Sequence, residues 1–245
     1  MATYCLLGYG KMGNAIASIL SQHKENQVLI INSQTDPEQR ADLIHQSDVV
    51  IEFSRPELAL SHIHEVLQAK KPIVVGTTGW QHELPQIREW ARIHEGAMVY
   101  ASNFSIGVNL FFSLNKFLAK LMNNEPSYRI SMEEIHHTQK LDSPSGTAIS
   151  TAQDIIHLHS GFSAWKETND LQFSSSETIP IHAVRHDAVI GTHTVLYKNE
   201  IDQISIKHEA FNRSGFAQGA IVAANWIQER KGIFTMEDVL SLHQN

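Results

Sequence analysis

Short apolar runs alternate with amphipathic segments along the first part of the chain. The runs predict strands at Tyr4–Leu7, Val28–Ile31, Val49–Phe53, Ile73–Val75 and Met98–Ala101. Segments between them repeat apolar positions with the helical period and predict helices at Met12–Leu20, Leu58–Leu67 and Leu84–Ile93. Strands that alternate with helices form parallel sheets, and continuously apolar runs suit strands covered on both faces. This part is therefore predicted to be a doubly wound domain of the dinucleotide-binding type.

The pattern changes after Ala101. A helix is predicted from about Ile106 to Met122, then a strand at Tyr128–Ile135, a helix from Gly146 to about His159 and a polar stretch at 160–176. Strand-like runs follow without helices between them, near Ile179–Val184, His193–Tyr197 and Ile201–His208. Such a series predicts a largely antiparallel sheet and hence an α+β domain. The tail returns to helix at Phe216–Arg230 and Met236–Leu242, which we expect to pack on the first domain.

The predicted fold class is therefore α/β, with an N-terminal Rossmann-like domain followed by an α+β C-terminal domain. The first domain is expected to comprise residues 1–104 and 217–245, and the second residues 105–216.

Composition narrows the class of function. The chain has 19 Lys and Arg against 26 Asp and Glu, a net charge of −7, which argues against nucleic acid or an anionic membrane as the main partner. Cys5 is the only cysteine, so neither a disulfide framework nor a thiolate metal cluster is expected. No targeting segment is recognisable at the N-terminus, and no run approaches the about 18 apolar residues of a membrane span. We expect a cytoplasmic protein.

A glycine-rich loop directly follows the first predicted strand and opens a helix. It reads Gly8-Tyr9-Gly10-Lys11-Met12-Gly13, the spacing G-x-G-x-x-G. In a strand-turn-helix context this spacing lets backbone N–H groups and the positive end of the helix meet a pyrophosphate. The alternative, a tight turn without a ligand, is disfavoured by that context.

Two further polar segments follow predicted strands. They are Gly76-Thr77-Thr78-Gly79 and Ala101-Ser102-Asn103-Phe104-Ser105. Either alone is equally typical of an ordinary turn. Because ligands bind at the carboxyl ends of parallel strands, the two segments are expected to line one crevice with the glycine loop. Their hydroxyl and amide groups suit a ribose and a nicotinamide carboxamide.

The most informative segment for chemistry runs from Glu134 to Ala148 and reads EIHHTQKLDSPSGTA. His136 and His137 are adjacent on a strand and so point to opposite faces, where they are poorly placed to share one metal ion, and no metal site is predicted. The sequence Ser145-Gly146-Thr147 begins a helix and offers free N–H groups and the positive helix end to a carboxylate or phosphate. Lys140 adds a formal charge nearby.

Each of these residues also has an ordinary structural interpretation. Ser145 or Thr147 could serve only as an N-cap, and the histidines could be two surface residues among the 15 present. The combination of two histidines, a lysine and an anion-binding helix start in one short segment favours a functional site.

The segment resembles the signature E-x-H-H-x-x-K-x-D-x-P-S-G-T-A of the dihydrodipicolinate reductase (4-hydroxy-tetrahydrodipicolinate reductase) family of diaminopimelate and lysine biosynthesis. Further family landmarks occur in the same order along the chain, namely Ile51–Pro56, Gly76–Gly79, Ala101–Asn109, Arg213 and Phe216–Ala220. The resemblance spans essentially the whole chain.

The resemblance implies roles for individual residues. It makes His136 the catalytic acid/base and Lys140 the second proton donor. It implies that the substrate carboxylates bind to His137, Ser145, Gly146 and Thr147, and that the nucleotide binds to Gly8–Gly13, Gly76–Thr78 and Ala101–Phe104. It also implies a Rossmann-like domain completed by the C-terminal helices, and a mixed-sheet domain that builds a homotetramer.

The implied reaction is reduction of a small cyclic dicarboxylate by NADH or NADPH, with loss of the substrate hydroxyl. Asn32 stands where the family often has an acidic residue for the adenosine ribose. Because Asn32 or Ser33 can hydrogen-bond either a hydroxyl or a phosphate oxygen without charge repulsion, and Lys11 could supply a cation to the phosphate, weak discrimination between the two cofactors is expected.

Two other functions fit parts of the sequence. A dehydrogenase that forms a thioester needs a cysteine nucleophile, and Cys5 within the first strand is a poor candidate. A nucleotide-sensing module without turnover needs the glycine loop but neither His136 nor Lys140. Cofactor oxidation measured with and without the substrate separates the sensor from the enzyme.

Overall fold

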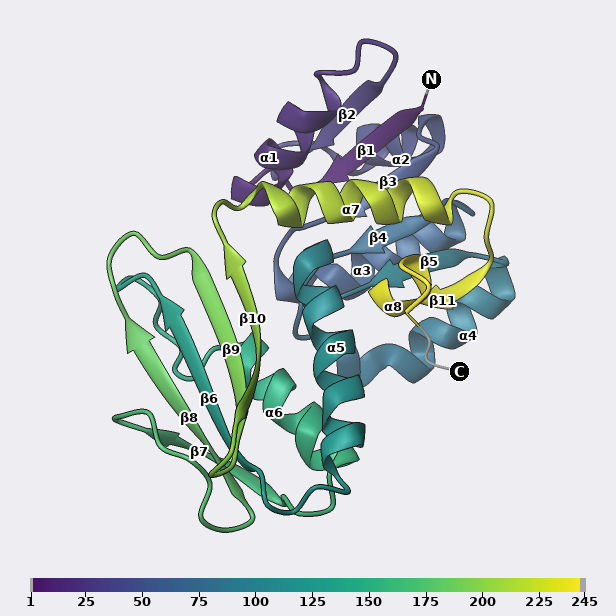
Figure 1. The fold of residues 1–245 in the computed structure, drawn as a ribbon. Helices are drawn as coiled ribbons and strands as arrows, with labels where there is room; N and C mark the ends of the chain where they lie inside the picture. Colours follow the sequence, from purple (N-terminus) through teal and green to yellow (C-terminus); the bar gives the residue numbers. More distant parts are fainter. Residues whose placement is uncertain (1, 243–245) are drawn as a thin grey trace. The chain divides into compact units, whose positions relative to one another are not determined.

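The computed structural model describes residues 2–242, which form two compact units (Figure 1). The first unit comprises the chain up to Ile106 together with the residues from Ser214 onward, and the second comprises Gly107–Arg213. The chain thus leaves the first unit once and returns to it.

Within residues 2–242, the first unit contains a six-stranded sheet in the order β11-β5-β4-β3-β1-β2. Its strands are β1 (Thr3–Leu7), β2 (Gln27–Ile31), β3 (Val49–Glu52), β4 (Ile73–Val75), β5 (Ala97–Tyr100) and β11 (Gly232–Phe234). Each neighbouring pair runs parallel. The expected doubly wound parallel sheet is confirmed.

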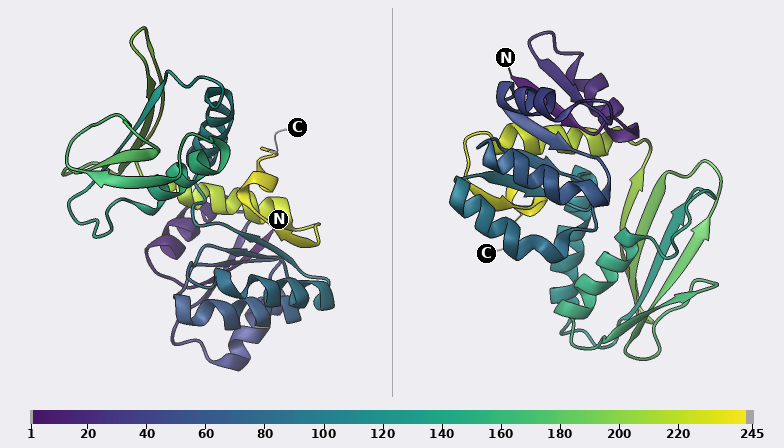
Figure 2. Two further views of the ribbon diagram at one scale, coloured as in Figure 1. Left: turned by 90° about the horizontal axis from the view of Figure 1, so that it is seen from below. Right: turned by 180° about the vertical axis from the view of Figure 1, so that it is seen from behind.

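Helices cover both faces of this sheet. They are α1 (Lys11–Leu20), α2 (Pro37–Gln46), α3 (Pro56–Gln68), α4 (Leu84–His94), α7 (Ser214–Ile227) and α8 (Met236–Val239), with a short 3₁₀ turn at Gln81–Glu83. On β1, Leu6 belongs to the core cluster that includes residues of α1 and α7, whereas its neighbour Cys5 belongs to the cluster that includes residues of α2, α3 and α4, because successive strand residues point to opposite faces. Figure 2 shows α2, α3 and α4 together on one face.

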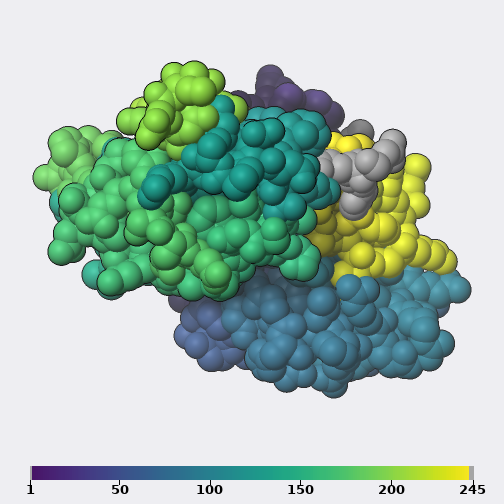
Figure 3. Space-filling model, turned by 60° about the horizontal axis from the view of Figure 1, so that its bottom comes forward, coloured from purple at the N-terminus to yellow at the C-terminus, as the bar shows by residue number. Residues whose placement is uncertain are grey.

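The C-terminal helix α7 packs on the first unit, as the sequence analysis expected. One face of α7 is buried in the core that contains Leu6, Ile51 and Val99. Its buried residues are Ala217, Ala220, Ala223, Ala224 and Ile227. Small side chains allow close approach: a Cβ added to Gly219 would lie 1.7 Å from the carbonyl oxygen of Phe104. In the space-filling view the yellow C-terminal residues lie against the blue residues of the same unit (Figure 3).

Two elements of the first unit escaped the sequence prediction. Helix α2 reads PEQRADLIHQ and buries only Ile44, so it has almost no apolar face. Its start does carry a signal, because Asp36 accepts a hydrogen bond from the N–H of Gln39 (2.9 Å) and Pro37 occupies the first turn. Strand β11 is three residues long and forms by pairing with β5.

The second unit contains, within the described part of the chain, a five-stranded sheet in the order β10-β9-β6-β8-β7. Its strands are β6 (Arg129–His136), β7 (Ala164–Thr168), β8 (Thr178–Arg185), β9 (Gly191–Lys198) and β10 (Gln203–Ala210). Helices α5 (Ile106–Met122) and α6 (Gly146–Leu158) pack on one face around Ile130, Ile181 and Tyr197.

The expectation of a largely antiparallel sheet was wrong for one half of this unit. β9 pairs antiparallel with β6 and β10, but β8 runs parallel to both β6 and β7. Two connections return the chain in the same direction, namely α6 between β6 and β7, and residues 169–177 between β7 and β8. The mixed sheet implied by the family resemblance is confirmed. Strand β7 lies in the polar stretch 160–176, for which no strand was predicted, and is an edge strand with the sequence AWKET.

Among the described residues, no helix combines the length and the apolar character needed to cross a membrane.

Candidate active site

The glycine loop between β1 and α1 is shaped by close backbone contacts. Gly8 has φ +104°, and a Cβ there would lie 2.4 Å from the carbonyl oxygen of Phe53. A Cβ on Gly13 would lie 2.3 Å from the carbonyl oxygen of Gly8. Both positions therefore require glycine. Gly10 differs, because a Cβ there would meet no atom within 4 Å, so the loop opens to free space at this residue.

A cavity of about 580 Å³ lies at this opening. It is formed by residues at and just after the ends of β1, β2 and β3, with one more from α2 and two from α3, namely Leu7, Gly8, Tyr9, Gly10, Ile31, Asn32, Ser33, Thr35, Arg40, Phe53, Ser54, Arg55, Leu58 and His62. The chain passes from the edge strand β2 back across β1 to β3, so the cavity lies at the carboxyl ends of the strands where the strand order reverses. In open α/β sheets this is the usual ligand position.

The residues present fit a dinucleotide phosphate. Helix α1 begins at Gly10 without a side-chain cap and without an acidic residue in its first turn. Its first N–H groups and its positive end are therefore suited to an anion. Arg40 and Arg55 bring two guanidinium groups to the cavity wall. The sequence analysis missed both arginines.

The structure brings together only some of the residues expected to bind the cofactor. Gly8, Tyr9, Gly10 and Asn32 line the cavity, whereas Lys11, Met12 and Gly13 do not. The two other expected segments, Gly76–Thr78 and Ala101–Phe104, are also absent from the lining.

Those two segments instead contact Phe53, which does line the cavity. A Cβ on Gly76 would lie 2.0 Å from the Phe53 ring, and the rings of Phe53 and Phe104 are 5.8 Å apart. The hydroxyl of Thr77 accepts a hydrogen bond from the N–H of Ser54 at 2.9 Å. Contact of these segments with the cofactor stays a prediction.

A buried carboxylate supports the cavity wall at the end of β3. Glu52 is 0% exposed and accepts hydrogen bonds from the N–H of Ser54 (3.0 Å) and from its hydroxyl. Nδ1 of His62 lies 3.5 Å from the same carboxylate. These contacts with Glu52 hold Ser54 and His62 in place, and both residues line the cavity.

In the second unit, His136 ends β6 and its imidazole has a carboxylate partner. Nδ1 of His136 is in close hydrogen-bond contact with Glu134, two residues earlier on the same face of the strand. Glu134 is 0% exposed. Its other oxygen accepts from Nη1 of Arg185 (2.9 Å) and from the N–H of Ser145 (3.2 Å). The sequence analysis assigned no role to Glu134 or Arg185.

His137 and Lys140, in the loop after β6, each contact another polar side chain. Nε2 of His137 is 3.3 Å from Nη2 of Arg213, and Nζ of Lys140 contacts both carboxylate oxygens of Asp142 at 2.8 and 2.9 Å. The hydrogen bond from Lys140 lowers the pKa of Asp142, and the backbone N–H of Gly146 contributes in the same direction.

The start of α6 has both features that the sequence allowed, an N-capping side chain and a helix start that is open to an anion. Ser145 is the N-cap, and its hydroxyl accepts a hydrogen bond from the N–H of Ala148 at 3.2 Å. Gly146 is exposed, and a Cβ there would meet no atom within 4 Å. Thr147 is half-buried in the first turn. The capping hydroxyl is occupied, while the helix start beside it is open.

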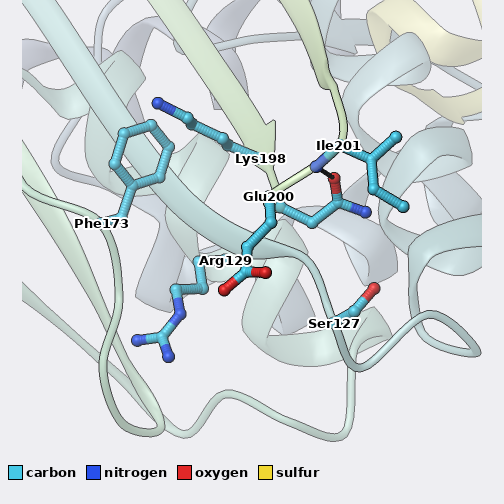
Figure 4. Close-up of a pocket in the computed structure, with 7 residues that line it drawn as sticks. Ser127, Arg129, Phe173, Lys198, Glu200 and Ile201 are labelled. Carbon is cyan, nitrogen blue, oxygen red and sulfur yellow. Dashed lines mark hydrogen bonds between the residues drawn. The ribbon is translucent and has the colours of Figure 1, made fainter.

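A hollow of about 500 Å³ at the other end of the sheet of this unit lies outside this arrangement (Figure 4). It is lined by Ser127, Arg129, Phe173, Lys198, Asn199, Glu200 and Ile201. Arg129 begins β6, whereas His136 ends it, so the hollow is separated from His136 by the length of the strand.

The chain matches known proteins over both units. Residues 3–104 match the family described as "Dihydrodipicolinate reductase, N-terminus", and residues 107–240 match "Dihydrodipicolinate reductase, C-terminus". The 4-hydroxy-tetrahydrodipicolinate reductase of Christiangramia forsetii is 44% identical over 236 residues, which is 96% of each chain. The enzyme of the same name from Buchnera aphidicola (Schizaphis graminum) is 37% identical over 79% of this chain and 72% of that protein.

A solved structure, the dipicolinate-bound dihydrodipicolinate reductase from Paenisporosarcina sp. TG-14, is similar in fold. It superposes with a TM-score of 0.78 at 25% identity and covers 96% of this chain and 97% of its own.

Proposed function

The chain belongs to the dihydrodipicolinate reductase family, and we propose how its residues carry out the NAD(P)H-dependent reduction of 4-hydroxy-tetrahydrodipicolinate. The reaction gives tetrahydrodipicolinate and water in lysine biosynthesis through diaminopimelate. One observation carries the proposal: the segment from His136 to Thr147 joins an imidazole backed by a buried carboxylate, an ion-paired lysine and an open helix start.

His136 serves as the general acid. The reduced nicotinamide supplies a hydride when it is bound, so the substrate must also take up a proton as its hydroxyl leaves as water. An imidazole can supply that proton near neutral pH, and His136 contacts the buried carboxylate of Glu134 beside the loop and helix start that are proposed to bind the substrate. Lys140 is the second proton donor in this proposal.

The substrate carboxylates bind to the loop after β6 and to the start of α6. Lys140 already holds a carboxylate, that of Asp142, in a two-oxygen contact. His137 with Arg213, and the open first turn at Gly146 and Thr147, offer further positive or N–H-rich groups. Two such places suit a small dicarboxylate.

The nucleotide binds to the first unit, in the cavity beside Gly10, with its pyrophosphate at the start of α1. The proposal extends the expected cofactor set, which included Tyr9 and Asn32, to Arg40 and Arg55 on the cavity wall. Residues 1–104 with 217–245 are proposed as the nucleotide-binding domain, and residues 105–216 as the domain for substrate and oligomerisation.

Cofactor oxidation tests this function directly. Absorbance of NADH or NADPH is followed with purified protein, with and without 4-hydroxy-tetrahydrodipicolinate. We expect oxidation only when protein, cofactor and substrate are all present. Tight nucleotide binding without any oxidation would indicate a sensing module instead.

Weak discrimination between NADH and NADPH is the second expected result. Asn32 and Ser33 are neutral, and Arg40 lines the same cavity while its Nε holds Glu65 at 3.0 Å. We expect wild-type kcat/KM values for the two cofactors within about tenfold of each other. Arg40→Ala should reduce kcat/KM for NADPH about tenfold and for NADH much less, because NADPH offers the guanidinium a charged 2′-phosphate whereas NADH offers it only a neutral hydroxyl.

Two comparisons complete this measurement. Asn32→Glu should shift the preference toward NADH by repelling the phosphate. Arg92→Ala removes another ion-paired arginine of the first unit, one that does not line the cavity, and should leave the ratio unchanged. Equal losses for both cofactors in Arg40→Ala would contradict a role at the 2′ position.

We also propose that the protein acts in the cytoplasm as a homotetramer. An apolar stripe on α5 supports association: Leu110, Leu114, Phe117 and Leu121 recur at helical spacing and are 44–56% exposed. Light scattering on the purified protein should give the mass of four chains. A monomer at micromolar concentration would contradict the tetramer and leave the catalytic proposal standing.

A further inference from the structure

We infer that Glu134 is a positioning residue that holds the Nδ1 proton of His136, so that the imidazole acts on the substrate through Nε2. The inference rests on the proposed role of His136 as general acid. It adds the group that sets the tautomer and orientation of that acid.

The contact between Glu134 and His136 determines which nitrogen of the imidazole carries a proton. An ionised carboxylate only accepts hydrogen bonds, so the contact between Glu134 and Nδ1 of His136 requires a proton on Nδ1. Burial alone would raise the pKa of Glu134, but the hydrogen bonds from His136 and Arg185 bring it below its ordinary value. The carboxylate is therefore ionised at neutral pH.

The carboxylate of Glu134 is held in place and cannot turn away from His136. Its remaining oxygen accepts from Nη1 of Arg185 and from the N–H of Ser145. Arg185 is itself held by two backbone carbonyls, those of Val184 (2.8 Å) and Asp142 (2.6 Å). Three parts of the unit thus fix the carboxylate: β6, β8 and the start of α6.

On the other side of the His136 ring, no side chain of the facing strand residue occupies the space beside Nε2. A Cβ on Gly191 of β9 would lie 2.9 Å from Nε2 of His136, so glycine at this position leaves the space beside Nε2 free of a side chain. His193, also on β9, packs edge-on against the ring with centroids 5.1 Å apart. Burial, and then the charge of His136, lower the pKa of His193 to about 3. His193 is neutral and does not compete for the proton.

The charged and titratable groups around His136 come from several elements. They are Glu134 on β6, Arg185 on β8, His193 on β9, His208 on β10, and Lys140 with Asp142 in the loop after β6. Among these, Glu134 is the one anion in direct contact with the imidazole.

In this arrangement the proton passes from Nε2 of His136 to the substrate. The Nε2–H bond of the protonated imidazole breaks as its proton passes to the substrate, and the bonding electrons stay on Nε2. The neutral ring keeps its Nδ1–H bond to Glu134 and takes up a new proton on Nε2 from solvent before the next turnover.

Glu134→Gln tests this role with little change of shape. The amide can keep its oxygen toward Arg185 and Ser145, but its NH₂ group would face Nδ1 and favour the wrong tautomer. We expect kcat to fall about 100-fold. We also expect the basic limb of the kcat/KM pH profile to move down by about one pH unit, because the protonated ring loses its anion while Arg185 stays close.

Matched variants separate this role from a structural one. Glu133→Gln alters a similar carboxylate on the opposite face of β6, where Oε2 lies 3.2 Å from Nδ1 of His182, and should leave the profile in place. In a His136→Gln background, Glu134→Gln should cost less than threefold, since Glu134 acts through His136. The inference would be overturned if Glu134→Gln lowered kcat as much in the His136→Gln background as it does in wild type. It would also be overturned if the basic limb of the kcat/KM pH profile of Glu134→Gln did not move.

A measurement on the wild-type protein avoids dependence on the folding of a variant. Nitrogen-15 NMR of labelled protein, assigned with His136→Gln, should show neutral His136 protonated on Nδ1. Protonation on Nε2 would overturn the inference whether or not the enzyme turns over. Absence of turnover in wild type would instead count against the proposed function.

Discussion

Replacing His136 by glutamine is expected to lower kcat by about two to four orders of magnitude, the usual effect of removing a positioned general acid. Glutamine is similar in reach, and its amide can donate to the buried carboxylate of Glu134 in place of Nδ1. The local hydrogen bonds can therefore persist. What is lost is the proton that the imidazole carries, so the loss should fall on kcat measured at saturating substrate and cofactor.

The control for His136→Gln uses another histidine of the same sheet. His182 on β8 also has a carboxylate partner, Glu133, but the pair lies on the opposite face of the sheet. His182→Gln should retain wild-type turnover. Fluorescence titration should give nearly unchanged NADH affinity for both variants, because the proposed nucleotide site lies in the other unit. A His136→Gln enzyme with full turnover would remove this residue from the mechanism.

The sequence predicted the parts of the fold that have strong periodic patterns. Strands β1 and β3 are buried on both faces and appear as unbroken apolar runs, so their pattern revealed them. Helix α2 and strand β7 lacked such a pattern. α2 buries a single residue, and β7 is an edge strand with no fully buried residue. Their formation depends on capping and on pairing with β8, which a linear pattern of apolar residues does not contain.

The parallel pairing of β8 with β6 also could not be predicted from the pattern of apolar residues. The residues of β8 alone fit either direction, and the connections through α6 and through residues 169–177 determine it. The family resemblance supplied the mixed sheet, whereas the order of apolar runs predicted the wrong direction for this strand.

The candidate site shows the same division between local and distant contacts. Gly8, Gly10 and the segment His136–Thr147 were found because their chemistry is contiguous in sequence. Arg185 reaches Glu134 from 51 residues away, so only the strand register brings them together. Gly191 has no local motif that marks it as the residue beside Nε2.

Arg40 was missed for a related reason. It lies on α2, which the sequence pattern did not reveal, and it lines the cavity because that helix follows β2 at the sheet edge. A basic residue soon after the second strand was the available signal, but the register of the helix was needed to use it.

Lys140→Ala is expected to raise KM for the substrate about tenfold or more and to lower kcat as well. The reason is visible in the contact that Lys140 already makes: its Nζ lies 2.8 and 2.9 Å from the two oxygens of Asp142. A charge-assisted contact of this kind contributes about 1.5–3 kcal/mol, which corresponds to about ten- to a hundredfold in affinity. Proposed as a ligand of one substrate carboxylate, Lys140 should contribute similarly there.

A planar dicarboxylate inhibitor separates binding from proton supply. Pyridine-2,6-dicarboxylate accepts no hydride, so its inhibition constant reports binding alone. Lys140→Ala should weaken it about ten- to a hundredfold. His136→Gln keeps Lys140 and should bind it nearly as wild type does. Lys207→Ala, which removes another ion-paired lysine of the same unit, is the matched control. If Lys140→Ala binds the inhibitor as tightly as wild type, Lys140 does not hold a carboxylate, and a loss of kcat would then reflect proton supply alone.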